Sequence, residues 1–321
     1  MKNKILLISG DPNSINSELI FKVWKKLNNS LKKRIYLISN YALLKAQFKN
    51  LKYSTNIIKL NNINEDIKTN KLKVLNIDIK FQTPFNIKEK YASNFVLNSL
   101  NKAHKLALRN DVAGIINCSI DKKLLKKKEI GVTEYLSSKC GLRDNSQVML
   151  ISNNKLSVSP ITTHIDIKKI SKKIETKFII NKVKTIDLWF RKKIKRKPKI
   201  AILGLNPHNA EFRKDSEEKK IIIPSILQIK KLGISVNGPL VADTLFINDY
   251  KQFDVIIGMY HDQVLAPFKA IFKFDAINVT LGLKYLRVSP DHGTAVNLIG
   301  KNKANINSLL KCISFINKFG R

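Results

Sequence analysis

The sequence has little cysteine, few acidic side chains and no long apolar run, and each shortage excludes a class of protein. The three cysteines lie far apart and lack the spacing of a metal motif, so their odd number predicts reduced thiols and a cytoplasmic location. No apolar run approaches the roughly 20 residues that span a membrane, so we expect no membrane partner. The apolar start "KILLIS" breaks off at "GDP" without a cleavage pattern, which argues against a secretory signal.

Acidic residues are scarce: 24 Asp and Glu stand against 59 Lys and Arg, a formal net charge of +35. Such an excess raises nucleic acid as a partner, because clustered cations release counterions from phosphates. The lysines are scattered along the chain, however, and the densest run, "RKKIKRKPK" at 191–199, falls where a helix is expected to give way to a strand. We therefore favour a solvated basic surface that attracts small anionic substrates, and we expect no nucleic-acid partner.

Apolar runs of strand length alternate with amphipathic stretches along most of the chain. The expected strands are 4–9, 34–39, 112–120, 147–152, 199–205, 253–260 and 276–283, and helices are expected over 17–28, 41–50, about 94–110, about 168–194 and 305–320. Runs that are β-branched and apolar on both faces suit buried parallel strands, so the alternation predicts an α/β fold. A length of 321 residues suits one large or two medium domains, and the Asn- and Lys-rich segment 51–90 fits neither pattern.

Three of the five histidines follow expected strands: His164 in "SPITTHID", His208 in "LGLNPHNAE" and His261 in "MYHDQ". In α/β folds, ligands gather beyond the carboxyl ends of the strands. Three neutral imidazoles with an open coordination position can bind a divalent metal such as zinc, which polarises a substrate oxygen. The histidines are far apart in the chain, so their spacing also fits unconnected loop or capping histidines.

A second polar constellation, "FDAINVTLGLKYLRVSPDHGTA", contains Asn278, Arg287, Asp291 and His292. Arginine binds phosphate or carboxylate through charge-assisted hydrogen bonds, and Gly293 before a threonine allows close approach of the backbone to a ligand. Ordinary turn chemistry with a surface salt bridge is the alternative explanation.

Taken together, the motifs "TTH", "LNPHNAE", "NGPLVADTLF", "MYHDQVLAPFK" and "NVTLGLKYLRVSPDHGTA" resemble, in order and spacing, the 4-hydroxythreonine-4-phosphate dehydrogenase family of pyridoxal phosphate biosynthesis. The resemblance covers essentially the whole chain. It implies two α/β/α domains with an interdomain cleft, similar to isocitrate and isopropylmalate dehydrogenases, and a homodimer whose active site is shared between subunits. It also implies oxidation of 4-phosphooxy-L-threonine with NAD, followed by loss of carbon dioxide to give 3-amino-2-oxopropyl phosphate.

The resemblance assigns roles to individual residues. It implies that His164, His208 and His261 bind a divalent metal (Zn, Mg or Co), which lowers the pKa of the substrate hydroxyl. The phosphorylated substrate is expected to contact Thr133, Lys269, Asn278 and Arg287, with Asp243, Asp262, Asp291 and His292 in catalytic or supporting positions. We place the first domain at about 1–121 with 282–321, and the second, which carries the metal ligands and dimer contacts, at about 122–281.

The chain departs from the family pattern in three places. The opening loop "GDPNSINSEL" has Ser14 and Asn16 where the family has glycines; if those glycines allow a positive φ or a close approach, asparagine substitutes better than serine. Val132 replaces a substrate-binding histidine, and Val264 replaces the glycine of "HDQG". Either nearby lysines (122, 123 and 126–128) hold the phosphate instead, or the enzyme acts on a related phosphorylated hydroxy acid, or it is an inactive homologue.

Overall fold

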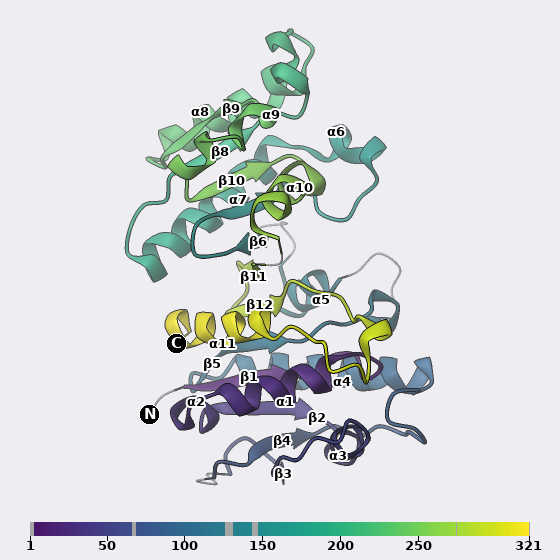
Figure 1. Cartoon of the computed structure of the whole chain (residues 1–321). Coiled ribbons are helices and arrows are strands. Elements are labelled where there is room, and N and C mark those ends of the chain that lie inside the picture. Colours follow the sequence, from purple (N-terminus) through teal and green to yellow (C-terminus); the bar gives the residue numbers. More distant parts are fainter. Residues whose placement is uncertain (1–2, 66–68, 126–130, 143–146, 274, 321) are drawn as a thin grey trace. The chain divides into compact units, whose positions relative to one another are not determined.

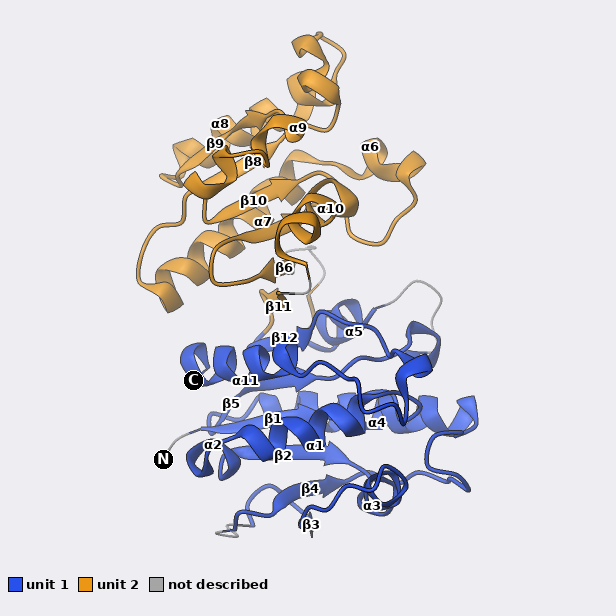
Figure 2. Ribbon diagram, in the orientation of Figure 1, with its two compact units in different colours: residues 1–140, 284–321 blue, residues 141–283 orange. Residues whose placement is uncertain are grey.

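The computed structural model describes residues 3–65, 69–125, 131–142, 147–273 and 275–320. It divides into two units, residues 1–140 with 284–321 and residues 141–283 (Figure 2). The first unit runs past the boundary at residue 121 suggested by the sequence, because helix α5 (Val132–Lys139) contacts helix α4 (Glu89–Ala107) of that unit. The chain therefore returns to the first unit only for its C-terminal segment.

Unit 1 is built on a wholly parallel sheet. Its strands are β1 (Lys4–Ile8), β2 (Ile35–Ser39), β3 (Ile57–Leu60), β4 (Leu72–Asn76), β5 (Val112–Asn117) and β12 (Arg287–Pro290), in the order β3-β4-β2-β1-β5-β12. β1, β2 and β5 are buried almost throughout, as expected for parallel strands covered on both faces. The segment 51–90, irregular in sequence, supplies β3 and β4.

Helices cover both faces of this sheet. They are α1 (Asn16–Lys26), α2 (Asn29–Lys32), α3 (Tyr41–Asn50), α4, α5 and α11 (Asn307–Phe319). α1 and α11 contact each other on one face, and α4 packs on the other (Figure 1). Gly114 of β5 allows α11 to approach, because a Cβ there would lie 2.7 Å from a side-chain carbon of Ile316.

Among the described residues of unit 2, the sheet is mixed, and one of its strands, β6, runs opposite to the others. The strands are β6 (Val148–Ser152), β7 (Ser157–Pro160), β8 (Ile200–Leu203), β9 (Val236–Leu240), β10 (Val255–Gly258) and β11 (Ile277–Leu281), in the order β11-β6-β7-β10-β8-β9. β6 is antiparallel to β7 and β11, whereas β7, β10, β8 and β9 are parallel. The helices are α6 (Ile170–Lys173), α7 (Thr176–Trp189), α8 (Ile223–Lys231), α9 (Ala242–Leu245) and α10 (His261–Phe272).

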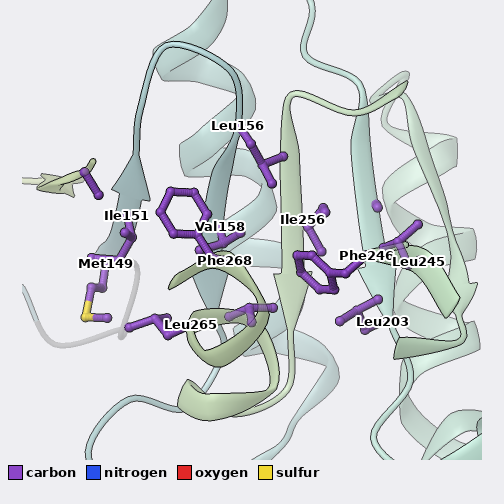
Figure 3. Packing of buried hydrophobic residues seen from close by; sticks show 13 residues of the cluster. Met149, Ile151, Leu156, Val158, Leu203, Leu245, Phe246, Ile256, Leu265 and Phe268 are labelled. Atoms are coloured by element: carbon purple, nitrogen blue, oxygen red, sulfur yellow. The ribbon is translucent and has the colours of Figure 1, made fainter. Parts of the chain in front are cut away.

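An apolar cluster fixes α10 on the sheet of unit 2. Leu265 and Phe268 of α10 pack with Ile151, Val158 and Ile256 of three neighbouring strands (Figure 3). Each fully buried side chain of this size contributes about 1.5–3 kcal/mol relative to exposure. The start of α10, and with it His261, is therefore held at the carboxyl end of β10.

Two sequence expectations concern membranes and thiols. Among the described residues, no helix is both long enough and apolar enough to cross a membrane. Cys118, Cys140 and Cys312 are free and buried. Burial raises the pKa of the Cys118 thiol to about 12, so this thiol is protonated at neutral pH.

Candidate active site

The three histidines singled out in the sequence all lie at strand exits of unit 2. His164 follows β7, His208 follows β8, and His261 is the first residue of α10 after β10. Because β7, β10 and β8 are adjacent and parallel, their carboxyl ends lie at one edge of the sheet. The rings of His164 and His261 have centroids 5.5 Å apart and are tilted by 41°.

His208 is not part of a closed ligand set with these two rings. Within the described ranges, no group of three or more His, Cys, Asp and Glu side chains is close enough to hold a metal ion. His208 is exposed on the turn that follows β8, and His164 is also exposed. The structure thus pairs two of the three histidines and leaves the third on a neighbouring loop.

A carboxylate orients the ring of His261. Nδ1 of His261 lies 2.6 Å from Oδ1 of Asp262, so the Nδ1–H tautomer donates to this carboxylate and leaves Nε2 as the ring atom able to bind a ligand. Metal-binding histidines usually have such a partner on the second nitrogen, which fixes the tautomer and raises the basicity of the ligating nitrogen. Asp262 therefore supports His261 from the adjacent position.

The turn that carries His208 has an unusual backbone. Residues 208–212 all have φ between 49° and 57°, a left-handed turn built from residues other than glycine. Each such residue costs roughly 1–2 kcal/mol, so the turn persists only because its surroundings hold it. Buried Asn209 donates from Nδ2 to the carbonyl oxygen of Pro239 at 3.1 Å and thereby anchors the turn to β9.

Glu218 binds the backbone immediately before the same turn. Its fully buried carboxylate accepts hydrogen bonds from the backbone N–H groups of Leu205 (2.7 Å) and Asn206 (2.8 Å), and from Nδ2 of Asn206 (3.0 Å). Burial raises the pKa of Glu218, but the hydrogen bonds from Asn206 and Leu205 outweigh burial and leave the pKa below its ordinary value. The carboxylate thus stays ionised and fixes the chain just before His208.

In unit 1, Arg287 lies in a second polar group. At the start of β12, Arg287 is buried and donates from Nε to Oδ1 of Asn117 at 2.7 Å and from Nη1 to Oγ1 of Thr133 at 3.2 Å. Burial lowers the pKa of Arg287 to about 10, so the guanidinium is cationic at neutral pH. The structure therefore brings together two of the expected substrate residues, Arg287 and Thr133, and adds Asn117, which the sequence did not single out.

The remaining candidate residues are distributed over both units. Lys269 is half-buried on α10, and Asp243 is exposed in the first turn of α9. Asn278 lies in β11, and its Oδ1 is buried without a hydrogen-bond partner in the described part of the chain. After β12, the backbone N–H of Asp291 donates to Oγ of Ser308 (2.9 Å), and Nδ1 of His292 lies 2.9 Å from the carbonyl oxygen of Gly293.

The altered opening loop does not use a positive φ at either replaced glycine. Gly10 has φ +75° and cannot carry a Cβ, but neither Ser14 nor Asn16 has a positive φ. Both are buried: Oγ of Ser14 donates to the carbonyl oxygen of Asp11 at 2.6 Å, and Nδ2 of Asn16 donates to that of Ser119 at 2.8 Å. The side chains thus tie the loop to itself and to the end of β5.

The other departures also find local explanations. Val264 is fully buried in the apolar cluster of unit 2 and packs against Gly258. A Cβ at position 258 would lie only 2.6 Å from Cγ1 of Val264. Val132 is the first residue of α5, next to Thr133. Lys122 and Lys123 are exposed, with Nζ of Lys123 3.5 Å from Oδ2 of Asp121, and the lysines at 126–128 lie outside the described residues.

Sequence reasoning missed Gln263 and Glu218, which hold the strand exits of unit 2. Oε1 of Gln263 accepts from the N–H of Met259, and Nε2 donates to the carbonyl oxygen of Gly204, both at 2.7 Å. The sequence offered one signal, since Gln263 lies two residues after His261 in "HDQ". Nothing comparable marks Glu218, whose partners are mostly backbone groups.

Comparisons with known proteins agree on one family. The family model described as pyridoxal phosphate biosynthetic protein PdxA matches residues 13–316. A 4-hydroxythreonine-4-phosphate dehydrogenase of Sulfurihydrogenibium sp. is 35% identical, over 97% of this chain and 96% of its own. A D-threonate 4-phosphate dehydrogenase of Salmonella typhimurium is 33% identical over 68% of each chain.

Solved structures show the same fold. A 4-hydroxythreonine-4-phosphate dehydrogenase from Klebsiella pneumoniae superposes with a TM-score of 0.85 at 25% identity, covering 98% of this chain and 99% of its own. An isocitrate dehydrogenase from Methylococcus capsulatus has a TM-score of 0.50 at 11% identity, covering 98% of this chain and 84% of its own, which is a likeness of fold alone. The α/β fold expected from the sequence is confirmed.

Proposed function

The chain belongs to the PdxA family of pyridoxal phosphate biosynthetic proteins, and we propose that it oxidises 4-phosphooxy-L-threonine with NAD and releases 3-amino-2-oxopropyl phosphate and carbon dioxide. As a member of that family it is an oxidoreductase of pyridoxal phosphate biosynthesis. The observation that carries the proposal is the pairing of His164 and His261 at adjacent strand exits in a chain that matches the family model over residues 13–316.

The types of the donor side chains suit a divalent metal, although the described residues do not bring three of them together. Two imidazoles lie side by side, one of them is oriented by Asp262, and a third is presented by the neighbouring exit. We propose that His164, His208 and His261 hold a Zn, Mg or Co ion. When bound, such an ion would supply a Lewis acid that lowers the pKa of the substrate hydroxyl and offsets negative charge on the substrate.

The chain's own cations bind and orient the anionic substrate. Buried Arg287 keeps its guanidinium in one orientation through Asn117 and Thr133, which suits bidentate recognition of a phosphate or carboxylate. Lys269 adds an ammonium group, and the unpartnered Oδ1 of Asn278 is an acceptor for a substrate N–H or O–H group. Within unit 1, the guanidinium of Arg287 is already fixed before it binds an anionic group, which lowers the entropic part of the barrier.

The acidic and histidine side chains have supporting roles in this proposal. Asp262 orients His261, and we assign Asp243, Asp291 and His292 to proton transfer or to hydrogen bonding around the substrate. A residue in this group that accepts the hydroxyl proton must lie within hydrogen-bond reach of that oxygen in the bound state.

The proposed enzyme is a cytoplasmic homodimer whose active site is shared between subunits. Ile167 (80% exposed) and Ile247 (67% exposed) of unit 2 are large apolar side chains that a partner could cover. Nucleic acid is not proposed as a partner. Within the basic run 191–199, Arg191 pairs with Asp187 at 2.6 Å and Arg196 binds both carboxylate oxygens of Asp254 at 2.6 and 2.5 Å.

Two observations favour a second substrate. Val132 stands where the family places a substrate-binding histidine, and a relative named for D-threonate 4-phosphate matches two thirds of the chain. The two substrates share the phosphate and the hydroxyl group to be oxidised, but they differ at the neighbouring amino or hydroxyl group. A site that has lost a polar contact can accept either compound.

The proposal is tested by measuring the formation of NADH from NAD with each of the two compounds, in the presence and in the absence of a chelator. We expect 4-phosphooxy-L-threonine to be oxidised with the higher kcat/KM, and chelation to abolish turnover. Faster turnover of D-threonate 4-phosphate would show that this compound, and not 4-phosphooxy-L-threonine, is the substrate. No NADH from either compound, together with no bound divalent metal, would identify a non-catalytic homologue and contradict both enzyme proposals.

A further inference from the structure

The parallel strands β8 and β10 separate where the two histidine-bearing segments begin. Their backbone pairing ends at Ile202 and Ile257. Beyond these residues, β8 continues into the turn of His208 and β10 into the helix of His261. In the described chain, no ladder bond joins these strands past this point, so another group must set the spacing of the two exits.

The side-chain amide of Gln263 spans this opening. Its Oε1 accepts the N–H of Met259 and its Nε2 donates to the carbonyl oxygen of Gly204, each at 2.7 Å. The partners fix the orientation of the amide, because an N–H requires the oxygen end and a carbonyl requires the NH₂ end. The side-chain amide of Gln263 therefore makes the two hydrogen bonds, one accepted and one donated, that a backbone peptide group would make between the strands.

The bridge continues to the third exit through Met259. The carbonyl oxygen of Met259 accepts from the N–H of Thr162 at 3.1 Å and from its Oγ1 at 2.7 Å, two residues before His164. Thus one line of hydrogen bonds runs from the His164 segment through Met259 and Gln263 to Gly204, before the His208 turn. Each polar group in this line is satisfied, which favours a single arrangement.

We propose that Gln263 is a positioning residue that sets the spacing between the segments carrying His208 and His261. The proposal rests on the metal site proposed above. A metal ion requires its ligands within a few tenths of an ångström of ideal positions, so a change in spacing weakens binding without removing a ligand. Gln263 acts through the backbone, at Met259 and Gly204, and does not itself bind the ion.

The test uses Co²⁺ as the probe and the full chain purified without metal. Gln263→Met keeps the length of the side chain without its hydrogen bonds, and Gln263→Asn keeps the amide but is too short to span the strands. Gln228→Met, on the exposed face of α8, is the matched control. His208→Ala reports whether the proposed ligand set binds the ion at all.

We expect both Gln263 variants to raise the Kd for Co²⁺ by about 10- to 100-fold and to alter the visible absorption of the bound ion. Without metal, the peptide over residues 255–260 should show roughly tenfold faster hydrogen exchange at one amide, that of Met259, with the interior of β10 unchanged. Gln228→Met should match the wild type in both measurements.

The outcomes separate the two proposals. If the wild type binds Co²⁺, His208→Ala loses it, and the Gln263 variants keep the wild-type Kd and spectrum, the positioning role is wrong and the metal site stands. If the wild type binds no Co²⁺, or if His208→Ala binds it unchanged, the metal site fails and the positioning role fails with it. Melting temperatures exclude a trivial loss of fold, because every titration is made well below the lowest midpoint.

Discussion

Replacing Gly258 by alanine should destabilise unit 2, because the new methyl group would collide with the side chain of Val264. Val264 is also one of the positions at which the chain departs from the family pattern. The new Cβ would lie 2.6 Å from Cγ1 of Val264 and 2.9 Å from Oε1 of Gln263. Carbon atoms in contact prefer 3.5–4.0 Å, so Val264 would have to move by about 1 Å inside a packed cluster. Overpacking of this kind costs typically 1–3 kcal/mol, and we expect about 2 kcal/mol for Gly258→Ala.

A double-mutant cycle isolates this contact. Val264→Ala removes Cγ1 and should itself cost about 1–2 kcal/mol by loss of buried methyl groups. In that background, Gly258→Ala should cost less than about 1 kcal/mol, leaving a coupling energy of at least about 1 kcal/mol between the two sites. The shared contact is the only reason for this expected non-additivity.

Denaturation followed by tryptophan fluorescence measures these free energies. The two tryptophans lie in different units, Trp24 on α1 and Trp189 on α7, so a Trp24→Phe background leaves Trp189 as the reporter of unit 2. Equal costs of Gly258→Ala with and without the Val264→Ala substitution would refute the steric argument. A loss of Co²⁺ affinity in Gly258→Ala would in addition show that displacing Gln263 reaches the metal site.

The remaining predictions concern the two polar groups and one ion pair. His208→Ala should abolish metal binding and turnover with little change in the unfolding midpoint, because the side chain is exposed; metal affinity retained in this variant would refute the three-histidine set. Val132→His should leave kcat/KM equal or higher, since it restores a polar group beside Thr133, and a large loss would show that the pocket serves another ligand. Nζ of Lys4 lies 2.6 Å from Oδ2 of Asp111, and both side chains of this ion pair are partly exposed. Asp111→Asn should therefore lower the free energy of unfolding of unit 1 at pH 7 by at most about 1 kcal/mol. Hydrogen bonds from Arg109 and Lys4 hold the pKa of Asp111 well below its ordinary value, so this stabilisation is complete above the unfolded pKa of about 3.9 and is lost progressively as the pH falls from there through the lower pKa of the folded state. Denaturation curves at pH 7 and pH 3, with Trp24 as reporter, should therefore show a smaller difference in stability between Asp111→Asn and the wild type at the lower pH, and an unchanged difference would exclude the ion pair as its source.

Much of the fold is readable in the sequence where apolar runs are buried on both faces. The expected strands at 4–9, 34–39 and 112–120 correspond to β1, β2 and β5, whose interiors are buried throughout. β3 was missed because its apolar residues are few and are interrupted by Lys59, in a segment rich in Asn and Lys. β9 was missed because its sequence "VNGPL" contains a glycine and a proline, which normally mark turns.

The candidate site was predictable only in its residue types. Strand exits can be located from apolar periodicity, and histidines at three of them were visible for that reason. The left-handed turn at His208 was not predictable, because its residues are ordinary ones whose conformation depends on Asn209 and Glu218. Hydrogen bonds to backbone groups, such as those of Gln263, leave almost no trace in one sequence.

The interruption of unit 1 by unit 2 has a consequence for synthesis of the chain. Unit 2 is one continuous segment, residues 141–283, and its residues are complete before the ribosome makes the final part of unit 1. Until then β5 cannot pair with β12, and the face of the unit 1 sheet that α11 covers in the complete chain is exposed to solvent. Because domains generally fold as units during translation, unit 2 should reach its native state first, although the chain begins with unit 1. A chain truncated after residue 283 and released from the ribosome would therefore protect unit 2 from proteases and leave the first 140 residues susceptible to them.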